Sequence, residues 1–226
     1  MKLYYFNWHL STYISGVVSS DIELNGNDAI TLGCSGELKP CWNNMGAEAL
    51  GCVNCRFNQK SNYVLQNNTS QHLEINTLLS EDSNRQIDNI IHNFNYNNVD
   101  EIKQLEYAGV NIGYAALSSY ISYTRVNSPF IDNEFIGYFN TLLRVQLVLV
   151  FALQELFDKY EISEVVLYNG RTHDVRPVLE YSKSREIPVR VLESLVLNED
   201  TKLSREYPGV LPQNIDFRTK QIKDVW

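Results

Sequence analysis

The sequence predicts an α/β fold: a Rossmann-like, open and mostly parallel sheet with helices on both faces and a cysteine-rich inserted loop. Strand-like apolar runs alternate with helix-periodic segments along most of the chain, which is the pattern of a doubly wound sheet. Val165–Tyr168 has no polar interruption, as is typical of a central parallel strand. The 226 residues, 44% of them hydrophobic, suffice for one sizeable domain of this class.

A strand–helix–strand unit opens the chain. Leu3–Phe6 is apolar and predicts the first strand, and Ser11–Ser20 predicts a helix because its apolar residues recur at helical spacing. A turn at Asn25–Asp28 precedes a second apolar strand, Ala29–Gly33. Units of this kind pair their strands in parallel through a right-handed crossover.

Helices are predicted for most of the middle of the chain, after a short strand at Asn62–Leu65. Four segments show apolar residues at helical spacing: Ser80–Asn93 with Ser80 as its N-cap, Val99–Tyr107, Gly113–Thr124 and Asn133–Tyr160. The small residues of Gly113–Ser119 indicate either tight helix packing or close approach of a ligand. Leu147–Leu153 is the longest apolar stretch. It is far shorter than the roughly 20 residues of a membrane span, so we expect a core helix and no transmembrane segment.

Strands and helices alternate again in the carboxyl-terminal part. Val165–Tyr168 is followed by a helix over Val175–Arg185, with Pro177 in its first turn, and by a strand over Ile187–Leu192. From Leu197 onward the chain is polar and irregular. We therefore expect two parts. These are a Rossmann-like domain over residues 1–197, with a four-cysteine insertion at 34–55, and a polar linker or tail over 198–226.

Charge and motifs exclude several classes of function. The net charge is −8 and the sequence pI is about 5.0, so no nucleic acid partner is expected, because phosphate backbones bind basic surfaces. The sequence contains no G-x-G-x-x-G, Walker, G-x-S-x-G or H-E-x-x-H motif, so common nucleotide-binding, hydrolase and zincin functions have no support. No secretory signal follows Met1. The expected location is the cytoplasm, at most peripheral to the inner membrane through partners.

The four cysteines show the sharpest spacing. Cys34 and Cys41 are separated by six residues, and Cys52 and Cys55 form a C-x2-C pair. In a cytoplasmic chain such a cluster favours metal over disulfides. Four thiolates make a closed tetrahedral site that leaves no position for catalysis, so we expect a structural zinc ion. The alternatives are an iron–sulfur cluster, four free thiols or two disulfides.

A second candidate site follows the strand Val165–Tyr168. Asn169, Gly170 and Arg171 lie at its carboxyl end, where ligands bind in open α/β sheets. Gly170 permits close approach of a ligand, and Arg171 and Arg176 can clamp a phosphate or carboxylate beside a helix amino terminus. Alternatively, Asn169-Gly170 is only a turn. The arginines then pair with acids nearby in sequence: Asp174, Glu180 or Glu186.

Three more polar residues are candidates at the same edge of the sheet. His9 follows the first strand and can act as general base on an acceptor hydroxyl; otherwise it is a surface residue. Glu193 ends its strand and either binds a sugar hydroxyl or forms a surface salt bridge. His173, in the loop after Arg171, is a further candidate for substrate contact. The shared edge requires that the strands before His9 and Asn169 are parallel neighbours.

Several of these segments resemble one family. After His9, the run Leu32–Leu38, together with Cys41 and Cys52–Cys55, resembles the start of glycosyltransferases of capsule and surface-polysaccharide biosynthesis. Further segments resemble the same family in order along the chain: Ala116–Ser119, Val166–Arg171, Arg176 and Glu193. The cysteine set and Asn169–Arg171 are the distinctive parts of this resemblance.

The resemblance implies a bacterial enzyme of GT-B type, in which two Rossmann-like domains face each other across a cleft. This chain would be the amino-terminal domain, which takes a carbohydrate or lipid-linked carbohydrate acceptor. A nucleotide sugar, the donor, would bind to a carboxyl-terminal domain or partner subunit that this sequence does not supply. The alternative is a non-catalytic, zinc-stabilised interaction module in a polysaccharide assembly complex. In neither case do we expect the chain to be a complete enzyme.

Overall fold

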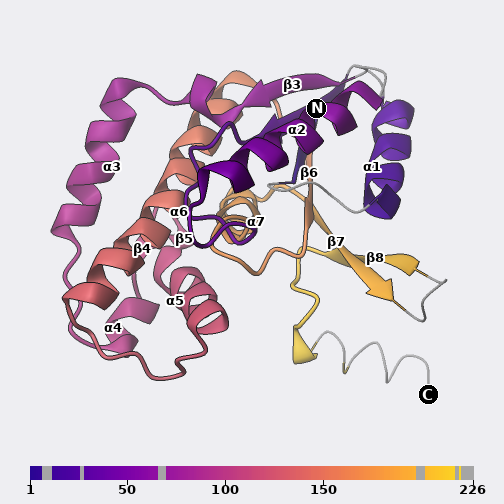
Figure 1. Cartoon of the computed structure of the whole chain (residues 1–226). Helices are drawn as coiled ribbons and strands as arrows, with labels where there is room; N and C mark the ends of the chain where they lie inside the picture. The colour runs from indigo at the N-terminus through magenta and orange to yellow at the C-terminus, as the bar shows by residue number, and fades with distance from the viewer. Residues whose placement is uncertain (7–11, 26–27, 66–69, 197–201, 217–218, 220–226) are drawn as a thin grey trace.

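A six-stranded, mostly parallel sheet organises the chain and confirms the predicted fold class (Figure 1). The structure is a computed structural model that describes residues 1–6, 12–25, 28–65, 70–196, 202–216 and 219. The strand order is β3-β2-β1-β6-β7-β8, with β8 alone antiparallel to its neighbour. These strands are β1 (Lys2–Tyr5), β2 (Ala29–Gly33), β3 (Gln71–Glu74), β6 (Glu164–Tyr168), β7 (Val189–Val196) and β8 (Lys202–Pro208). A separate antiparallel pair joins β4 (Glu106–Tyr107) and β5 (Val110–Asn111).

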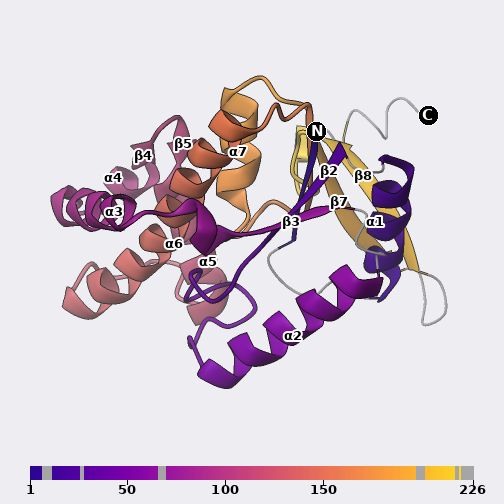
Figure 2. The same cartoon turned by 90° about the horizontal axis from the view of Figure 1, so that it is seen from above.

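Helices cover both faces of the sheet, as Figure 2 shows for α1 on one side and α5, α6 and α7 on the other. On the first face, Val18 and Ile22 of α1 pack in a small cluster with Tyr4. On the second face, α3 to α7 bury the main core against residues such as Leu3 and Tyr5. The helices are α1 (Thr12–Asn25), α2 (Ala49–Leu65), α3 (Glu81–Asn93), α4 (Val99–Lys103), α5 (Ile112–Thr124), α6 (Asn133–Lys159) and α7 (Arg176–Ser184). Ile75–Leu78 forms a 3-10 turn after β3.

Local sequence signals located several elements correctly. Ser80 is the N-cap of α3, because its hydroxyl accepts the Ser83 N–H at 3.0 Å. The Ser83 hydroxyl accepts the Ser80 N–H at 3.3 Å in return, so that the two residues form a capping box. Pro177 lies in the first turn of α7, as predicted.

Two predictions in the middle of the chain are wrong. Asn62–Leu65 is not a strand but the last turn of α2, which also contains two of the four cysteines of the predicted loop. The helix predicted over Val99–Tyr107 ends at Lys103, because Glu106–Tyr107 pairs with the following strand in a hairpin. In both places the tertiary environment outweighs the local pattern.

Both edge strands of the sheet were missed. β3 and β8 are polar strands, whose sequences lack the apolar runs of the central strands. β8 lies within the predicted tail 198–226, yet it is hydrogen-bonded to β7 along seven residues, from Lys202 to Pro208. The sheet therefore extends beyond the predicted domain boundary at residue 197.

The longest helix, α6, lies in the main core. Its 27 residues are long and apolar enough to cross a membrane, but 61% of its most apolar window is buried inside the domain. Phe139, Leu143 and Leu149 are completely buried. Within this fold α6 therefore packs as a core helix.

A polar network joins α1 to the sheet, and its contribution to stability is expected to depend on pH. The Asp21 carboxylate accepts the Tyr4 hydroxyl at 2.7 Å and an Arg190 guanidinium N–H at 2.6 Å. Partial burial opposes ionisation of Asp21, but the bonds from Tyr4 and Arg190 outweigh it, so the pKa lies below its usual 3.8. The stabilisation is therefore present above that value and is lost as the pH falls through the lowered pKa.

Asp21→Asn is expected to lower the free energy of unfolding by about 1 kcal/mol at neutral pH, because a charge-assisted hydrogen bond is replaced by a neutral one. Urea titrations at neutral pH and at a pH below the lowered pKa of Asp21 measure this, and the difference from wild type should vanish at the lower pH. Asp100→Asn is the control, since that carboxylate pairs with Lys103 while 84% exposed. An equal loss at both pH values would contradict the prediction.

Candidate functional site

The carboxyl ends of β1 and β6 lie side by side. They belong to the edge of the sheet that is formed by the ends of the strands, not to an outermost strand. The two strands are parallel neighbours, with Tyr5 opposite Leu167. The strand order reverses here, since β2 and β3 lie beyond β1 while β7 lies beyond β6. Ligands bind at such switch points in open α/β sheets. The shared edge that we expected is therefore present up to Phe6 and Tyr168, whereas His9 lies outside the described residues.

A left-handed turn follows β6. Asn169 and Gly170 have φ angles of 61° and 74°, which asparagine and glycine adopt more easily than other residues. The Asn169 N–H donates to the Leu192 carbonyl at 2.9 Å, and the Asn169 side-chain oxygen accepts the Arg171 N–H at 3.2 Å. The turn that we considered as the alternative for Asn169-Gly170 is thus present, and it sets the direction in which the chain leaves β6.

Glu193, in β7, holds this turn. Its carboxylate accepts the Tyr168 hydroxyl at 2.7 Å and the Asn169 side-chain amide at 2.5 Å. Both donors come from the end of β6, so Glu193 ties the two strands together at the edge. In this arrangement Glu193 and Asn169 position the backbone at the site.

Arg176 does not reach the edge as a ligand clamp. Its guanidinium pairs with Glu180 one turn further along α7, and both side chains are about three-quarters buried or more. Glu180 also accepts the Asn111 N–H at 2.8 Å. Of the alternatives for this arginine, the ion pair with Glu180 is the one that the structure contains.

Arg171 has a different environment. Its guanidinium carbon lies 5.9 Å from the centre of the Trp42 ring, in a cation–π contact. The side chain is half-buried, and among the described residues it forms no ion pair. The edge of the sheet therefore presents a cation on an aromatic platform, without a carboxylate of the described part of the chain to neutralise it.

The residues after Arg171 anchor the segment that carries the cysteines, residues 34–55, which we call the cysteine segment. The Asp174 carboxylate accepts the backbone N–H of Trp42 at 2.9 Å, and the Asp174 carbonyl accepts the Tyr5 hydroxyl at 2.7 Å. His173 is completely buried, with its Nε2 2.7 Å from the Pro40 carbonyl, so it is not available for the substrate contact that we considered. Burial first, and the Asp174 charge second, raise the pKa of the Tyr5 phenol well above its usual value.

All four cysteines line one small cavity of about 20 Å³. Cys34 follows β2, Cys41 lies in a short bridge with Asn44, and Cys52 and Cys55 lie one turn apart on α2. None of the four forms a disulfide bond, and burial raises the pKa of both Cys34 and Cys41 to about 12. Over the described residues, no three His, Cys, Asp or Glu side chains stand close enough to hold a metal ion as they are placed.

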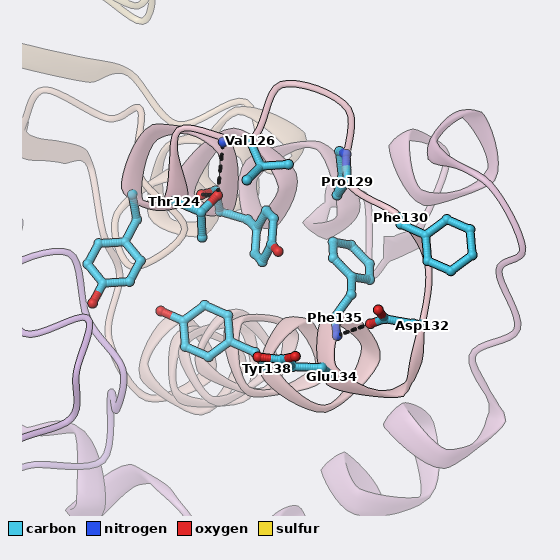
Figure 3. Close-up of a pocket in the computed structure, with 10 residues that line it drawn as sticks. Thr124, Val126, Pro129, Phe130, Asp132, Glu134, Phe135 and Tyr138 are labelled. Atoms are coloured by element: carbon cyan, nitrogen blue, oxygen red, sulfur yellow. Dashed lines mark hydrogen bonds between the residues drawn. The ribbon is translucent and has the colours of Figure 1, made fainter.

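A larger cavity of about 390 Å³ lies between α5 and α6 (Figure 3). Figure 3 shows Thr124 and Val126 on one side of it and Phe135 and Tyr138 of α6 on the other. The Tyr138 hydroxyl donates to the Met45 carbonyl at 3.1 Å. Tyr138, which lines this aromatic cavity, therefore also contacts the cysteine segment.

Sequence reasoning missed Tyr5 and Trp42 as contributors to the site, and it considered Asp174 only as an ion-pair partner of the arginines. Their contacts join residues that are 132 to 169 positions apart in the chain, which no local pattern encodes. Comparison of the chain with family models, with curated proteins and with solved structures finds no match. The functional argument therefore depends on the geometry of this edge.

Proposed function

We propose that this chain is the amino-terminal, acceptor-binding domain of a GT-B glycosyltransferase of surface-polysaccharide biosynthesis. A nucleotide sugar bound by a second domain or a partner subunit would be the donor. The acceptor hydroxyl would attack the anomeric carbon, and the nucleoside diphosphate would leave. The open parallel sheet with a switch point, and the resemblance of the cysteine and Asn169–Arg171 segments to this family, support the proposal.

One observation carries the proposal: Arg171 stands at the switch point, on Trp42, without an ion-pair partner in the described part of the chain. A guanidinium in this position binds a phosphate or carboxylate with two parallel hydrogen bonds. We assign Arg171 to an anionic group of the acceptor. Asn169, Gly170 and Glu193 shape the turn that holds it, and His9 is the proposed base that removes the proton of the acceptor hydroxyl.

The test compares anionic and neutral saccharides. Saturation-transfer NMR on the whole chain, with glucuronate and N-acetylglucosamine 1-phosphate as probes, should show binding, and glucose and N-acetylglucosamine should bind more weakly. Arg171→Gln should weaken the anionic probes about 10- to 100-fold, because a hydrogen bond to a charged group contributes about 1.5–3 kcal/mol.

Arg85→Gln is the matched control, since Arg85 is 72% exposed on α3 and pairs only locally with Asp82. It should leave binding unchanged. If Arg171→Gln binds the anionic probes as well as wild type does, the assignment of Arg171 is wrong.

A second candidate function is the non-catalytic interaction module. The observation that favours it is an apolar stripe on α2, where Leu50, Val53 and Phe57 are 69%, 60% and 71% exposed. These residues recur at helical spacing and face away from the cysteine cavity, which they do not line. Absence of binding for every saccharide probe, together with a stable protein partner lost in Phe57→Ser, would support this function over the first.

A further inference from the structure

We propose that Cys34, Cys41, Cys52 and Cys55 bind one zinc ion as a closed tetrathiolate site, and that the ion holds Trp42 in place beneath Arg171. The site requires the cysteine side chains to rotate toward the centre of the cavity that they line, because as placed they do not converge. The first part of the proposal is independent of the proposed function. Only the consequence for ligand binding at Arg171 rests on it.

The first support is that three of the four sulfurs accept hydrogen bonds from N–H donors. The Gly36 N–H donates to Cys34 Sγ at 3.2 Å. Side-chain amides donate to the two cysteines on α2. The Asn44 amide donates to Cys52 Sγ at 3.5 Å, and the Gln59 amide donates to Cys55 Sγ at 3.4 Å. A thiol is a weak acceptor, whereas a metal-bound thiolate gains strength from such bonds.

The second support is the arrangement of the four cysteines along the chain. Cys52 and Cys55 lie one turn apart on α2, and Cys34 and Cys41 reach the same cavity from the segment that follows β2. A Cys-x2-Cys pair joined by two further cysteines is typical of the ligand spacing of closed zinc sites.

The third support is size, which selects among metals. A cavity of about 20 Å³ exceeds the roughly 10–15 Å³ that one water-sized particle requires. In the present side-chain arrangement it holds one particle of that size, which favours a single ion over an iron–sulfur cluster of several atoms. Four sulfur ligands around a single ion are typical of structural zinc.

The position of Trp42 links the ion to the edge of the sheet. Trp42 follows Cys41 directly in the chain, donates its N–H to Asp174 and places its ring beside the Arg171 guanidinium. Fixing Cys41 on an ion therefore restricts Trp42. We expect that removal of zinc loosens the Trp42–Asp174 bond without direct contact between the metal and Arg171.

Metal content is the first measurement. Elemental analysis of the whole chain, purified without a metal-affinity step, should give one zinc per chain, and cobalt substitution should give the absorption bands of tetrahedral thiolate coordination. Cys52→Ser should lose the metal, while Asn54→Ser, an exposed change on the same turn of α2, should retain it. No zinc after anaerobic refolding with zinc, iron with acid-labile sulfide, or full zinc in Cys52→Ser would each overturn the site.

Amide hydrogen exchange at Trp42 tests the second part. It uses wild-type protein with and without a chelator, so it does not depend on whether a cysteine variant folds. Chelation should accelerate exchange at Trp42, and Ser80–Asn93, remote in sequence from the cysteine segment, serves as the internal reference. Unchanged exchange at Trp42 would overturn the positioning role and leave the metal site standing. Failure of saccharide binding in zinc-loaded wild type would instead count against the proposed function alone.

Discussion

Gly113→Ala is expected to destabilise the protein by about 3 kcal/mol, because backbone occupies the space that a side chain would need. A Cβ at Gly113 would lie 1.7 Å from the Ile102 carbonyl oxygen and 2.9 Å from the Leu105 Cβ. The Gly113 N–H also donates to the Leu105 carbonyl at 3.0 Å, which ties the residues just after α4 to the start of α5. The clash therefore cannot be relieved by rotation of a flexible side chain. Thermal unfolding should show a fall in Tm of about 10 °C.

Gly137→Ala is the matched control for this prediction. Gly137 is also helical, but it is exposed on α6, and an added Cβ would meet nothing within 4 Å. Alanine there should stabilise the helix by about 0.5–1 kcal/mol through its higher helix propensity. If the two variants shifted Tm in the same direction, the close approach of α4 and α5 would be in error.

Asp174→Ala is the second large effect, expected to cost about 2–4 kcal/mol. Asp174 is completely buried, and its carboxylate accepts the Trp42 N–H at 2.9 Å. Truncation leaves a part-buried donor without its acceptor, which costs about 1–3 kcal/mol, and it adds a cavity where the buried carboxylate was. Urea denaturation measures the loss, and limited proteolysis should show earlier cleavage in residues 34–48.

Asp174→Asn separates the hydrogen bond from the charge. The amide has the same shape and retains an oxygen that accepts the Trp42 N–H. We therefore expect this variant to lose less stability than Asp174→Ala and to keep residues 34–48 protected. Equal losses in the two variants would assign the effect to the carboxylate charge and would contradict the role given to the bond with Trp42.

The central part of the fold was predictable because its signals are local. β1, β2 and β6 are apolar runs, and the helix between β1 and β2 implies that these two strands are parallel. The shared edge of Phe6 and Tyr168 required in addition that β1 and β6 are parallel neighbours, and their pairing confirms this expectation. β3 and β8 were missed because an edge strand obtains its conformation from hydrogen bonds to a single partner.

The candidate site was predictable only in part. Glu180 was one of three acids considered for the arginines, and its spacing of four residues from Arg176 on a helix is the signal that could have selected it. The partner of Arg171 carried no such signal, since Trp42 lies far away in sequence. The cysteines were recognised by spacing, but the start of α2 was not, because Gly51 and Asn54 have low helix propensity.

The apolarity of α6 has a consequence for how this protein is made. β1 pairs early with β2, but its second neighbour, β6, is synthesised only after α6 is complete. Until then a newly made chain contains a helix whose length and hydropathy are those of a membrane-spanning segment. Chaperones and membrane-insertion machinery compete for such a stretch during translation. Slow translation or overproduction should therefore increase aggregation and mistargeting of this chain before any loss of stability in the finished fold.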